Sequence, residues 1–472
     1  MEAFGIEIGL TGQILAMFAL CIILVCIFEF VNGFHDTANA VATVIYTKTL
    51  KPVHAVVWSG FMNFLGVLAS SYIFGMAVAT KISSILPLET VLNRSSNEAI
   101  ALVLAVLVGS ILWNFGTWYL GIPCSSSHTL IGSLLGAGIA YSSLPENEGK
   151  VGVNWTEAIK IGNSLLISPL FGFSMAIILM FILKRMVEDK FIFKEPEPDH
   201  EPPFYIRVIL VCTCTLVSFF HGSNDGQKGI GLILIVLLAF LPTQFALSPD
   251  LNNKAMASKL FLVEERIIKA SAENYEMEAI MCNKATSVSN FATLLKGMDR
   301  KNVKDVMKVR KQIGLIAKDL DILAKEPNTF QDKNDLHLVK ETIVELKTYT
   351  TFIPFWTIIA ISLSLGIGTM VGWKRIVITI GEKIGKRHMT FAEGATAELV
   401  ASSTIGLASG LGLPVSTTHV LSSGVAGAMV ATKGIKNLQA GTIKSIVLAW
   451  ILTLPATILL SGGLYILFRF FI

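Results

Sequence analysis

The sequence has few charged residues for its length. Asp, Glu, Lys and Arg make up 15% of the 472 residues, whereas 53% are hydrophobic. Soluble domains carry about 25% charged residues, so this composition excludes an ordinary soluble protein and places most of the chain in lipid. The net charge of +4 is small and lies in the predicted loops, which gives no support for nucleic-acid binding.

Cysteine is scarce as well, and its spacing is not that of a zinc site. The six cysteines lie mostly in apolar segments, and we interpret them as small core residues rather than disulfide partners or metal ligands. We therefore expect no resident cofactor. They are Cys21, Cys26, Cys124, Cys212, Cys214 and Cys282.

The first apolar stretch lacks the features of a cleavable signal peptide. It has Glu2 and Glu7 in place of a basic segment and no small-residue cleavage site, so we expect it to remain as the first span. No Lys or Arg occurs before Lys48, whereas basic residues gather between Lys184 and Arg207. The positive-inside rule therefore favours the cytoplasm for the middle of the chain and the outside for the N-terminus.

Apolar windows of about 20 residues, long enough to cross roughly 30 Å of hydrocarbon, recur along the chain. Because backbone groups in lipid must be hydrogen-bonded internally and the windows lack barrel-like alternation, we predict helices. The expected fold is an all-α, polytopic membrane protein with about 10–12 transmembrane helices. The windows lie near residues 10–32, 55–79, 99–120, 160–183, 206–220, 229–247, 352–373, 393–412 and 440–468.

Two polar stretches divide the chain. Residues 185–204 are rich in proline and acidic residues, which is typical of a linker. Residues 248–350 are dense in charge with apolar residues at helical spacing, which predicts a helical extramembrane insertion. We therefore expect a first transmembrane repeat at 1–184, a cytoplasmic linker at 185–204, and a second repeat at 205–472 that the insertion at 248–350 interrupts.

Two motifs occur twice. Residues 32–40 (NGFHDTANA) are echoed by 221–229 (HGSNDGQKG), and residues 121–129 (GIPCSSSHT) by 412–420 (GLPVSTTHV). Asp36 and Pro123 are 87 positions apart, Asp225 and Pro414 are 189 apart, and the difference of 102 is about the length of the insertion. Duplicated, Gly/Pro-interrupted halves indicate a secondary transporter with its site at the repeat interface, and an odd number of spans per half would make the repeats inverted.

The Pro-Ser motifs have the pattern of a helix start. Proline pre-sets the backbone dihedral angle, hydroxyls cap the first turn, and apolar helix follows. Free N–H groups and the positive end of the helix dipole then form an anion site, to which the hydroxyls add donors without fixed charge. Two such starts meeting near the midplane would hold a tetrahedral oxyanion. The candidates are Ser125, Ser126 and Ser127 from one half and Ser416, Thr417 and Thr418 from the other.

A plainer interpretation remains open for these motifs. The hydroxyls would then only cap helices or pack small-residue helix interfaces, as they often do in membranes. His128 and His419 would likewise satisfy backbone carbonyls at the helix starts without touching a substrate.

Ionisable residues inside predicted spans are functional candidates, because each costs several kcal/mol unless it is paired or faces water. Gly33 and Gly222 would permit a broken helix beside Asp36 and Asp225, whose carboxylates would then face a cavity and bind a cation or a proton. The alternative is a buried ion pair between Asp225 and Lys228, one turn later. The full set is Glu29, Asp36, Asp225, Lys228 and Glu398, with His35, His128, His221 and His419 beside them.

At these residues the chain resembles the inorganic phosphate transporter (Pit) family, and the bacterial low-affinity branch in particular. The resemblance covers nearly everything except the insertion. It implies a symporter in which the paired helix starts hold inorganic phosphate and in which Asp36 and Asp225 belong to the coupling-ion region. The segments that carry it are 32–46, 126–132, 221–231 and 414–423.

The resemblance also bears on the coupling ion. Where sodium-coupled relatives have asparagines, this chain has His35 and Lys228, so two sodium ligands are missing, although Asn39 and Asn224 leave carbonyl oxygens. Asn63 stands where eukaryotic members have a glutamate, and Glu398 matches their second one. The ammonium of Lys228 would stand in for a sodium ion, which favours proton coupling. Similar bacterial proteins imply phosphate carried as a neutral complex with a divalent cation such as magnesium.

Several alternatives stay open at this point. Sodium-coupled phosphate symport and sulfate transport fit the same fold, since neutral donors suit either tetrahedral anion. An enzyme using His35 and Asp36 as an acid/base pair is disfavoured, because adjacent helical residues do not face each other and no nucleophile or metal set accompanies them. A channel is also disfavoured. The sequence does not decide the role of the insertion and leaves a homo-oligomer open.

Overall fold

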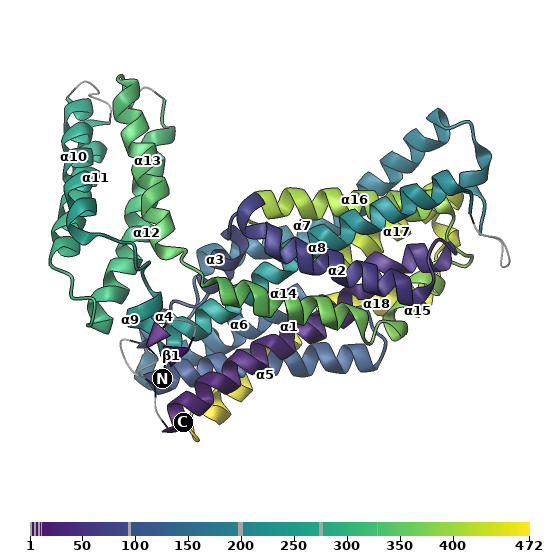
Figure 1. Cartoon of the computed structure of the whole chain (residues 1–472), viewed down its shortest axis with the longest axis horizontal. Coiled ribbons are helices and arrows are strands. Elements are labelled where there is room, and N and C mark those ends of the chain that lie inside the picture. Colours follow the sequence, from purple (N-terminus) through teal and green to yellow (C-terminus); the bar gives the residue numbers. More distant parts are fainter. Residues whose placement is uncertain are drawn as a thin grey trace. The chain divides into compact units, whose positions relative to one another are not determined.

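The computed structural model describes residues 2–3, 6–7, 10, 12–92, 96–196, 202–272, 277–327 and 329–472. Within these ranges the side chains of 2–3, 6–7, 37, 39, 89–90, 96 and 380–382 lie outside the description. Contacts divide the chain into two compact units, one formed by 1–87, 97–236 and 354–472 and the other by 88–96 and 237–353. Apart from the two-residue strands β1 (Glu2–Ala3) and β2 (Ile6–Glu7), the regular structure described is helical (Figure 1).

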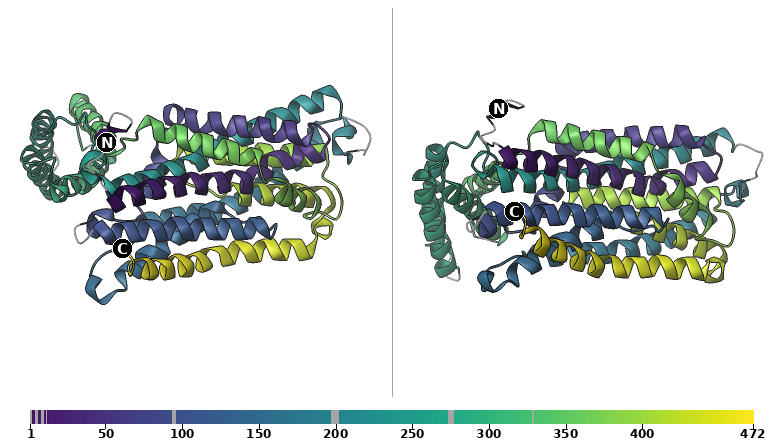
Figure 2. Two further views of the ribbon diagram at one scale, coloured as in Figure 1. Left: turned by 60° about the horizontal axis from the view of Figure 1, so that its bottom comes forward. Right: turned by 90° about the horizontal axis from the view of Figure 1, so that it is seen from below.

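The first unit is a bundle of long helices that run roughly side by side (Figure 2). Short 3-10 turns follow at Pro145–Asn147, Lys190–Phe193 and Ile435–Asn437. Its helices are α1 (Gly12–Tyr46), α2 (Pro52–Ile73), α3 (Ala77–Ser83), α5 (Ser96–Tyr119), α6 (Ser126–Ser142), α7 (Trp155–Met186), α8 (Phe204–Phe240), α14 (Phe355–Met370), α15 (Lys374–Glu382), α16 (Phe391–Gly410), α17 (Thr417–Lys433) and α18 (Ala440–Phe468).

Six helices of the described chain are long and apolar enough to cross a membrane: α1, α2, α5, α7, α8 and α18. Four shorter ones, α6, α14, α16 and α17, pack into the same bundle, with α6 against α18, α17 against α7, and α14 against both α1 and α2. The polytopic all-α fold predicted from the sequence is confirmed. The apolar windows at 206–220 and 229–247, however, are not two separate spans, because α8 contains the first window and residues 229–240 of the second.

The prediction of a break at Gly33 and Gly222 is wrong, because α1 and α8 run continuously through both positions. These glycines serve close packing instead. A Cβ at Gly33 would lie 2.5 Å from the carbonyl oxygen of Leu365, and one at Gly222 would lie 2.2 Å from that of Asn63. The chain breaks instead at the Pro-Ser motifs, where Gly121 and Gly412 adopt φ values of 67° and 63°.

The two repeats exchange their last helices. The motif helix of the first half, α6, packs on α18 of the second half, and α17 packs on α7 of the first. Gly136 and Gly427, which are 291 positions apart like Pro123 and Pro414, sit at these crossings. A Cβ would lie 2.1 Å from the Ile458 carbonyl oxygen at Gly136 and 2.4 Å from that of Phe173 at Gly427. Each half therefore depends on the other for its core.

We expect Gly136→Ala to destabilise the bundle by about 1–3 kcal/mol, because the added methyl group forces the α6 and α18 backbones apart. Thermal unfolding of the detergent-purified protein checks this. Gly162→Ala is the matched control, since nothing lies within 4 Å of a Cβ at that position of α7, and it should leave the midpoint unchanged or raise it. Equal midpoints for the two variants would contradict this packing argument.

The second unit contains α4 (Leu88–Leu92), α9 (Pro242–Phe245), α10 (Asn253–Ser271), α11 (Glu278–Lys296), α12 (Val303–Lys325) and α13 (Lys333–Thr350). The starts of α10, α12 and α13 are capped by the side chains of Asn252, Asn302 and Asp332. Lys259 on α10 donates to Glu341 and Glu345 on α13 at 2.8 and 2.7 Å. The second unit thus has its own helix caps and its own ion pairs between helices.

Candidate functional site

Two helix starts form the frame of the site. In each, proline and a backbone turn end the preceding helix, and a serine then caps the new one. Ser125 Oγ accepts a hydrogen bond from the His128 amide at 3.2 Å, and Ser416 Oγ accepts one from the His419 amide at the same distance. The remaining first-turn amides of α6 and α17 have no partner within their own helices, so both starts present donors and positive dipole ends.

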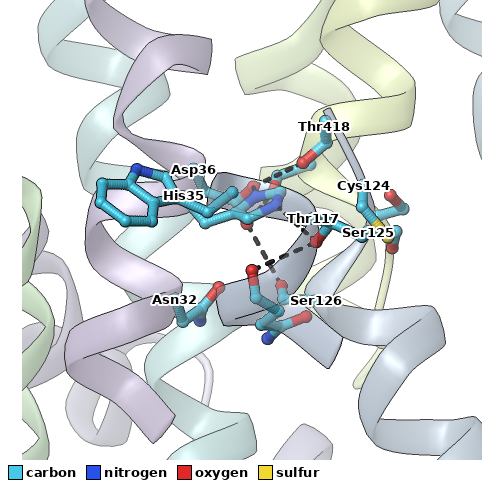
Figure 3. Close-up of polar contacts among 12 residues, drawn as sticks. Asn32, His35, Asp36, Thr117, Cys124, Ser125, Ser126 and Thr418 are labelled. Carbon is cyan, nitrogen blue, oxygen red and sulfur yellow. Dashed lines mark hydrogen bonds and ion pairs between the residues drawn. The ribbon is translucent and has the colours of Figure 1, made fainter. Parts of the chain in front are cut away.

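The two starts meet in the interior of the bundle. Ser127 Oγ donates to the carbonyl oxygen of Val415 at 2.7 Å, and the rings of His128 and His419 lie 4.6 Å apart. All six hydroxyl residues predicted for the site are buried. The structure therefore brings together the two halves of the predicted anion site, and Figure 3 shows the α6 start facing α1 and α17.

Asp36 gathers hydroxyls from both starts. Its carboxylate accepts from Ser126 at 3.2 Å, from Thr417 at 3.3 Å and from Thr418 at 2.5 Å. The neighbouring His35 places Nδ1 3.6 Å from Asp36 Oδ1 and Nε2 3.3 Å from Thr117 Oγ1 (Figure 3). Asp36 thus ties the two repeats together through side chains that an anion would also use.

Lys228 is the cation of the site. Its ammonium lies 2.6 Å from Asp225 Oδ2 and donates to Ser127 Oγ at 2.6 Å. Ser126 Oγ lies 3.4 Å from the same Asp225 oxygen. Lys228 is 1% exposed and Asp225 is fully buried. The ion pair proposed as an alternative at the sequence level is therefore present, and it touches the helix start as well.

A crossed pair of contacts joins the two Asp motifs. Asn32 Nδ2 donates to Asp225 Oδ2 at 3.4 Å, and His221 Nε2 lies 3.7 Å from Asp36 Oδ2 and 3.6 Å from Asp225 Oδ2. Asn32 and His221 are 189 positions apart, as are Asp36 and Asp225. Each motif copy therefore reaches the aspartate of the other. Asn32 was not among the predicted site residues, and His221 was named only as an ionisable residue beside them. The signal for both was that each is the first residue of its motif copy.

Two predicted residues have other positions. Asn224 secures the turn between α16 and α17, since its Nδ2 donates to Ser409 Oγ and Leu413 O and its Oδ1 accepts from the Val415 amide. Glu398 lies outside the cluster, where its carboxylate accepts from Thr213 Oγ1 at 2.5 Å. The side chain of Asn39 lies outside the described residues.

One subset of the site offers the donor atoms that a cation needs. Oxygen or nitrogen atoms of Asp36, His221 and Asp225 all lie within 4.8 Å of one another, and all three side chains are buried. Two carboxylates and an imidazole suit a divalent metal ion or, with one carboxylate protonated, a shared proton. The hydroxyl groups that could bind an anion therefore contact the carboxylates that could bind a cation.

Comparison with known proteins identifies a family. The model of the phosphate transporter family (PHO4) matches residues 32–461. The chain is 39% identical to the low-affinity inorganic phosphate transporter PitB of Escherichia coli (strain K12), over 94% of this chain and 95% of that one. It is 37% identical to PitA of the same organism over the same shares of both chains.

A solved structure shares the fold. It is named "The sodium-dependent phosphate transporter", and it aligns with a TM-score of 0.56 at 20% identity over 97% of this chain and 100% of its own. At that identity the likeness concerns the fold alone. The family match over most of the chain and its bundle of membrane-spanning helices show that this protein belongs to the phosphate transporter family, as a multi-pass protein of the bacterial inner membrane.

Proposed function

We propose that the chain takes up inorganic phosphate by proton-coupled symport, with the anion bound between the starts of α6 and α17. The observation that carries the proposal is that Asp36 accepts hydrogen bonds from Ser126, Thr417 and Thr418, on both starts. Relatives named as low-affinity inorganic phosphate transporters support the choice of anion.

The coupling of proton binding to phosphate binding follows from the number of O–H donors that the three hydroxyl groups offer. A hydroxyl has a single O–H donor, so Ser126, Thr417 and Thr418 donate either to Asp36 or to an anion. A proton on Asp36 removes the charge that makes these hydrogen bonds strong, and it also removes the repulsion between the carboxylate and phosphate. Binding of the anion and neutralisation of Asp36 therefore support each other, which is the thermodynamic requirement for symport.

Lys228 supplies a fixed positive charge. It lies against Ser127 and Asp225, where it attracts the anion without a bound sodium ion. An ammonium is a point charge with rotatable donors and does not clamp phosphate bidentately as arginine does, so the anion is released more easily. Lys228 therefore favours a proton over sodium as the coupling ion.

A second form of the substrate is favoured by one observation. The donor atoms of Asp36, His221 and Asp225 lie within 4.8 Å of one another, which suits the cation of a neutral metal-phosphate complex such as magnesium phosphate. Such a complex would lower the cost of removing a dianion from water. In either form, the packing of α6 on α18 and of α17 on α7 across the two halves suits alternating access, because moving one half repositions one helix start relative to the other.

The test is uptake of radiolabelled phosphate into proteoliposomes with separately imposed pH and sodium gradients, with and without magnesium. We expect a pH gradient alone to drive accumulation and a sodium gradient alone to be ineffective. Uptake driven only by sodium would contradict proton coupling. Stronger inhibition by unlabelled sulfate than by unlabelled phosphate would contradict the choice of anion.

A further inference from the structure

We propose that Glu29 is a proton-binding residue of the transport cycle and that Asn32 links it to the anion site. This inference rests on the proposed function, because it names a second acid, besides Asp36, that binds a proton during coupling. Glu29 lies on α1, two turns before Asp36, and nothing in the account above uses it.

The carboxyl group of Glu29 is fully buried and only half satisfied. Its Oε2 accepts a hydrogen bond from Asn32 Nδ2 at 3.3 Å, whereas its Oε1 has no hydrogen-bond partner within the described part of the chain. Gly229 of α8 leaves the space that the group fills, since a Cβ there would lie 2.5 Å from Oε1. An ionised carboxylate with an unpartnered buried oxygen is costly in a membrane interior, so this geometry suits the protonated acid.

Asn32 connects this group with the anion site. The same Nδ2 that donates to Glu29 also lies 3.4 Å from Asp225 Oδ2, and Asp225 in turn contacts Lys228 and Ser126. The negative charge of Asp225, close enough to contact the same amide, favours the neutral form of Glu29 by repulsion. A phosphate ion beside Lys228 adds further negative charge, which favours the neutral form of a nearby acid. Anion binding and proton binding at Glu29 therefore reinforce each other.

The charged groups around Glu29 are few. α8 presents Asp225, Lys228 and His221, and α1 itself presents Cys26 one turn before and Asp36 two turns after. α14, which packs against α1, carries no ionisable residue, and α2 carries His54 near its start and Tyr72 near its end. The protonation state of Glu29 thus responds mainly to the anion site.

The repeat symmetry is broken at this position. The equivalent of Glu29 in the second copy, 189 residues later, is Ser218, which donates to Ser59 Oγ at 2.9 Å and to the Cys214 carbonyl oxygen at 2.8 Å. A carboxyl group therefore occurs in one copy only. Ser218→Ala is therefore a matched control for Glu29→Gln, because it changes the equivalent position of the other copy without removing a carboxyl group.

Two measurements on the full-length protein test the inference. Infrared difference spectra, with and without inorganic phosphate, report the C=O band of a protonated carboxyl group. Proteoliposomes report phosphate counterflow without any gradient, and accumulation driven by a pH gradient. We expect the wild type and Ser218→Ala to show a protonated-carboxyl component that Glu29→Gln lacks, whereas components from Asp36 and Glu398 are shared by all three proteins. We expect Glu29→Gln, whose side chain mimics the protonated acid, to lose driven accumulation while counterflow persists.

The outcomes separate this inference from the proposed function. Identical protonated-carboxyl bands in the wild type and in Glu29→Gln overturn the assignment of a proton to Glu29, whatever drives uptake. Parallel loss of counterflow and driven accumulation in Glu29→Gln overturns the coupling role and leaves Glu29 as a packing residue. Wild-type protein that ignores the pH gradient overturns the proposed function itself, whereas failure confined to the Glu29 arm leaves proton coupling standing.

Discussion

Replacing Lys228 with asparagine is expected to reduce phosphate uptake by about 10²–10⁴-fold, since removing one partner of a buried ion pair costs about 3–5 kcal/mol. The variant leaves the buried Asp225 carboxylate without its ammonium, and it takes from Ser127 the donor that lies 2.6 Å away. The anion also loses the fixed charge that attracts it. Initial uptake rates at several phosphate concentrations measure the effect.

Lys160→Asn provides the matched control for this variant. Lys160 also pairs with an acid three residues away at 2.6 Å, Glu157, but its side chain is 56% exposed. Exposed pairs contribute about 0–1 kcal/mol, so uptake should barely change. Sodium-dependent uptake in Lys228→Asn would support the role of the ammonium as a built-in cation. Sodium-independent uptake at the wild-type rate would contradict it.

Asp36→Asn is expected to abolish the response of uptake to a pH gradient and to slow uptake at least about tenfold, because hydrogen bonds to a charged group contribute about 1.5–3 kcal/mol each. The carboxamide offers one acceptor oxygen in place of two, so the three hydroxyls of Ser126, Thr417 and Thr418 can no longer all be held. Nor can it take up a proton in the working pH range. Uptake with and without an imposed pH gradient distinguishes these two losses.

Asp189→Asn is the control for the aspartate variant. Asp189 also accepts a hydroxyl hydrogen bond, from Tyr205, and an amide hydrogen bond, from Phe191. It lies before the 3-10 turn at Lys190–Phe193, away from the anion site, and the protein should transport normally without its charge. An Asp36→Asn protein that still follows the pH gradient would show that Asp36 is not a site of coupling.

The helix starts could be predicted from the sequence because their signals are local. Proline, the capping serine and the following apolar run fix the geometry of a start within a few residues, and the repetition of the motif indicates that two starts belong together. The ion pair of Asp225 and Lys228 could also be predicted from the sequence, because side chains three residues apart on a helix are neighbours.

The errors arose where the reason for a residue lies on another helix. Glycine at positions 33 and 222 suggests a break when only local conformation is considered, yet both glycines allow another backbone to approach within van der Waals contact. The crossed contacts of Asn32 and His221 with the opposite aspartates depend on how α1 and α8 face each other. The position of Glu398 beside Thr213 similarly depends on the packing of α16.

The half-satisfied carboxyl of Glu29 shows a further limit of the sequence. The sequence identifies an acid in a span, but whether that acid is paired depends on which side chains surround it in the folded bundle. Both Glu29 and Asp225 accept from Asn32 and have one oxygen without a hydrogen-bond partner in the described residues, but the Lys228 ammonium lies 2.6 Å from Asp225 and compensates its charge.

The measurement that tests the central claim most directly is an experimental structure of the full-length protein with inorganic phosphate bound. We predict phosphate density between the starts of α6 and α17, within hydrogen-bonding distance of Ser127, Thr417 and Lys228, with the Asp36 carboxylate no longer accepting from all three hydroxyls. Phosphate bound away from both helix starts, or bound while Asp36 keeps every one of those hydrogen bonds, would contradict the account.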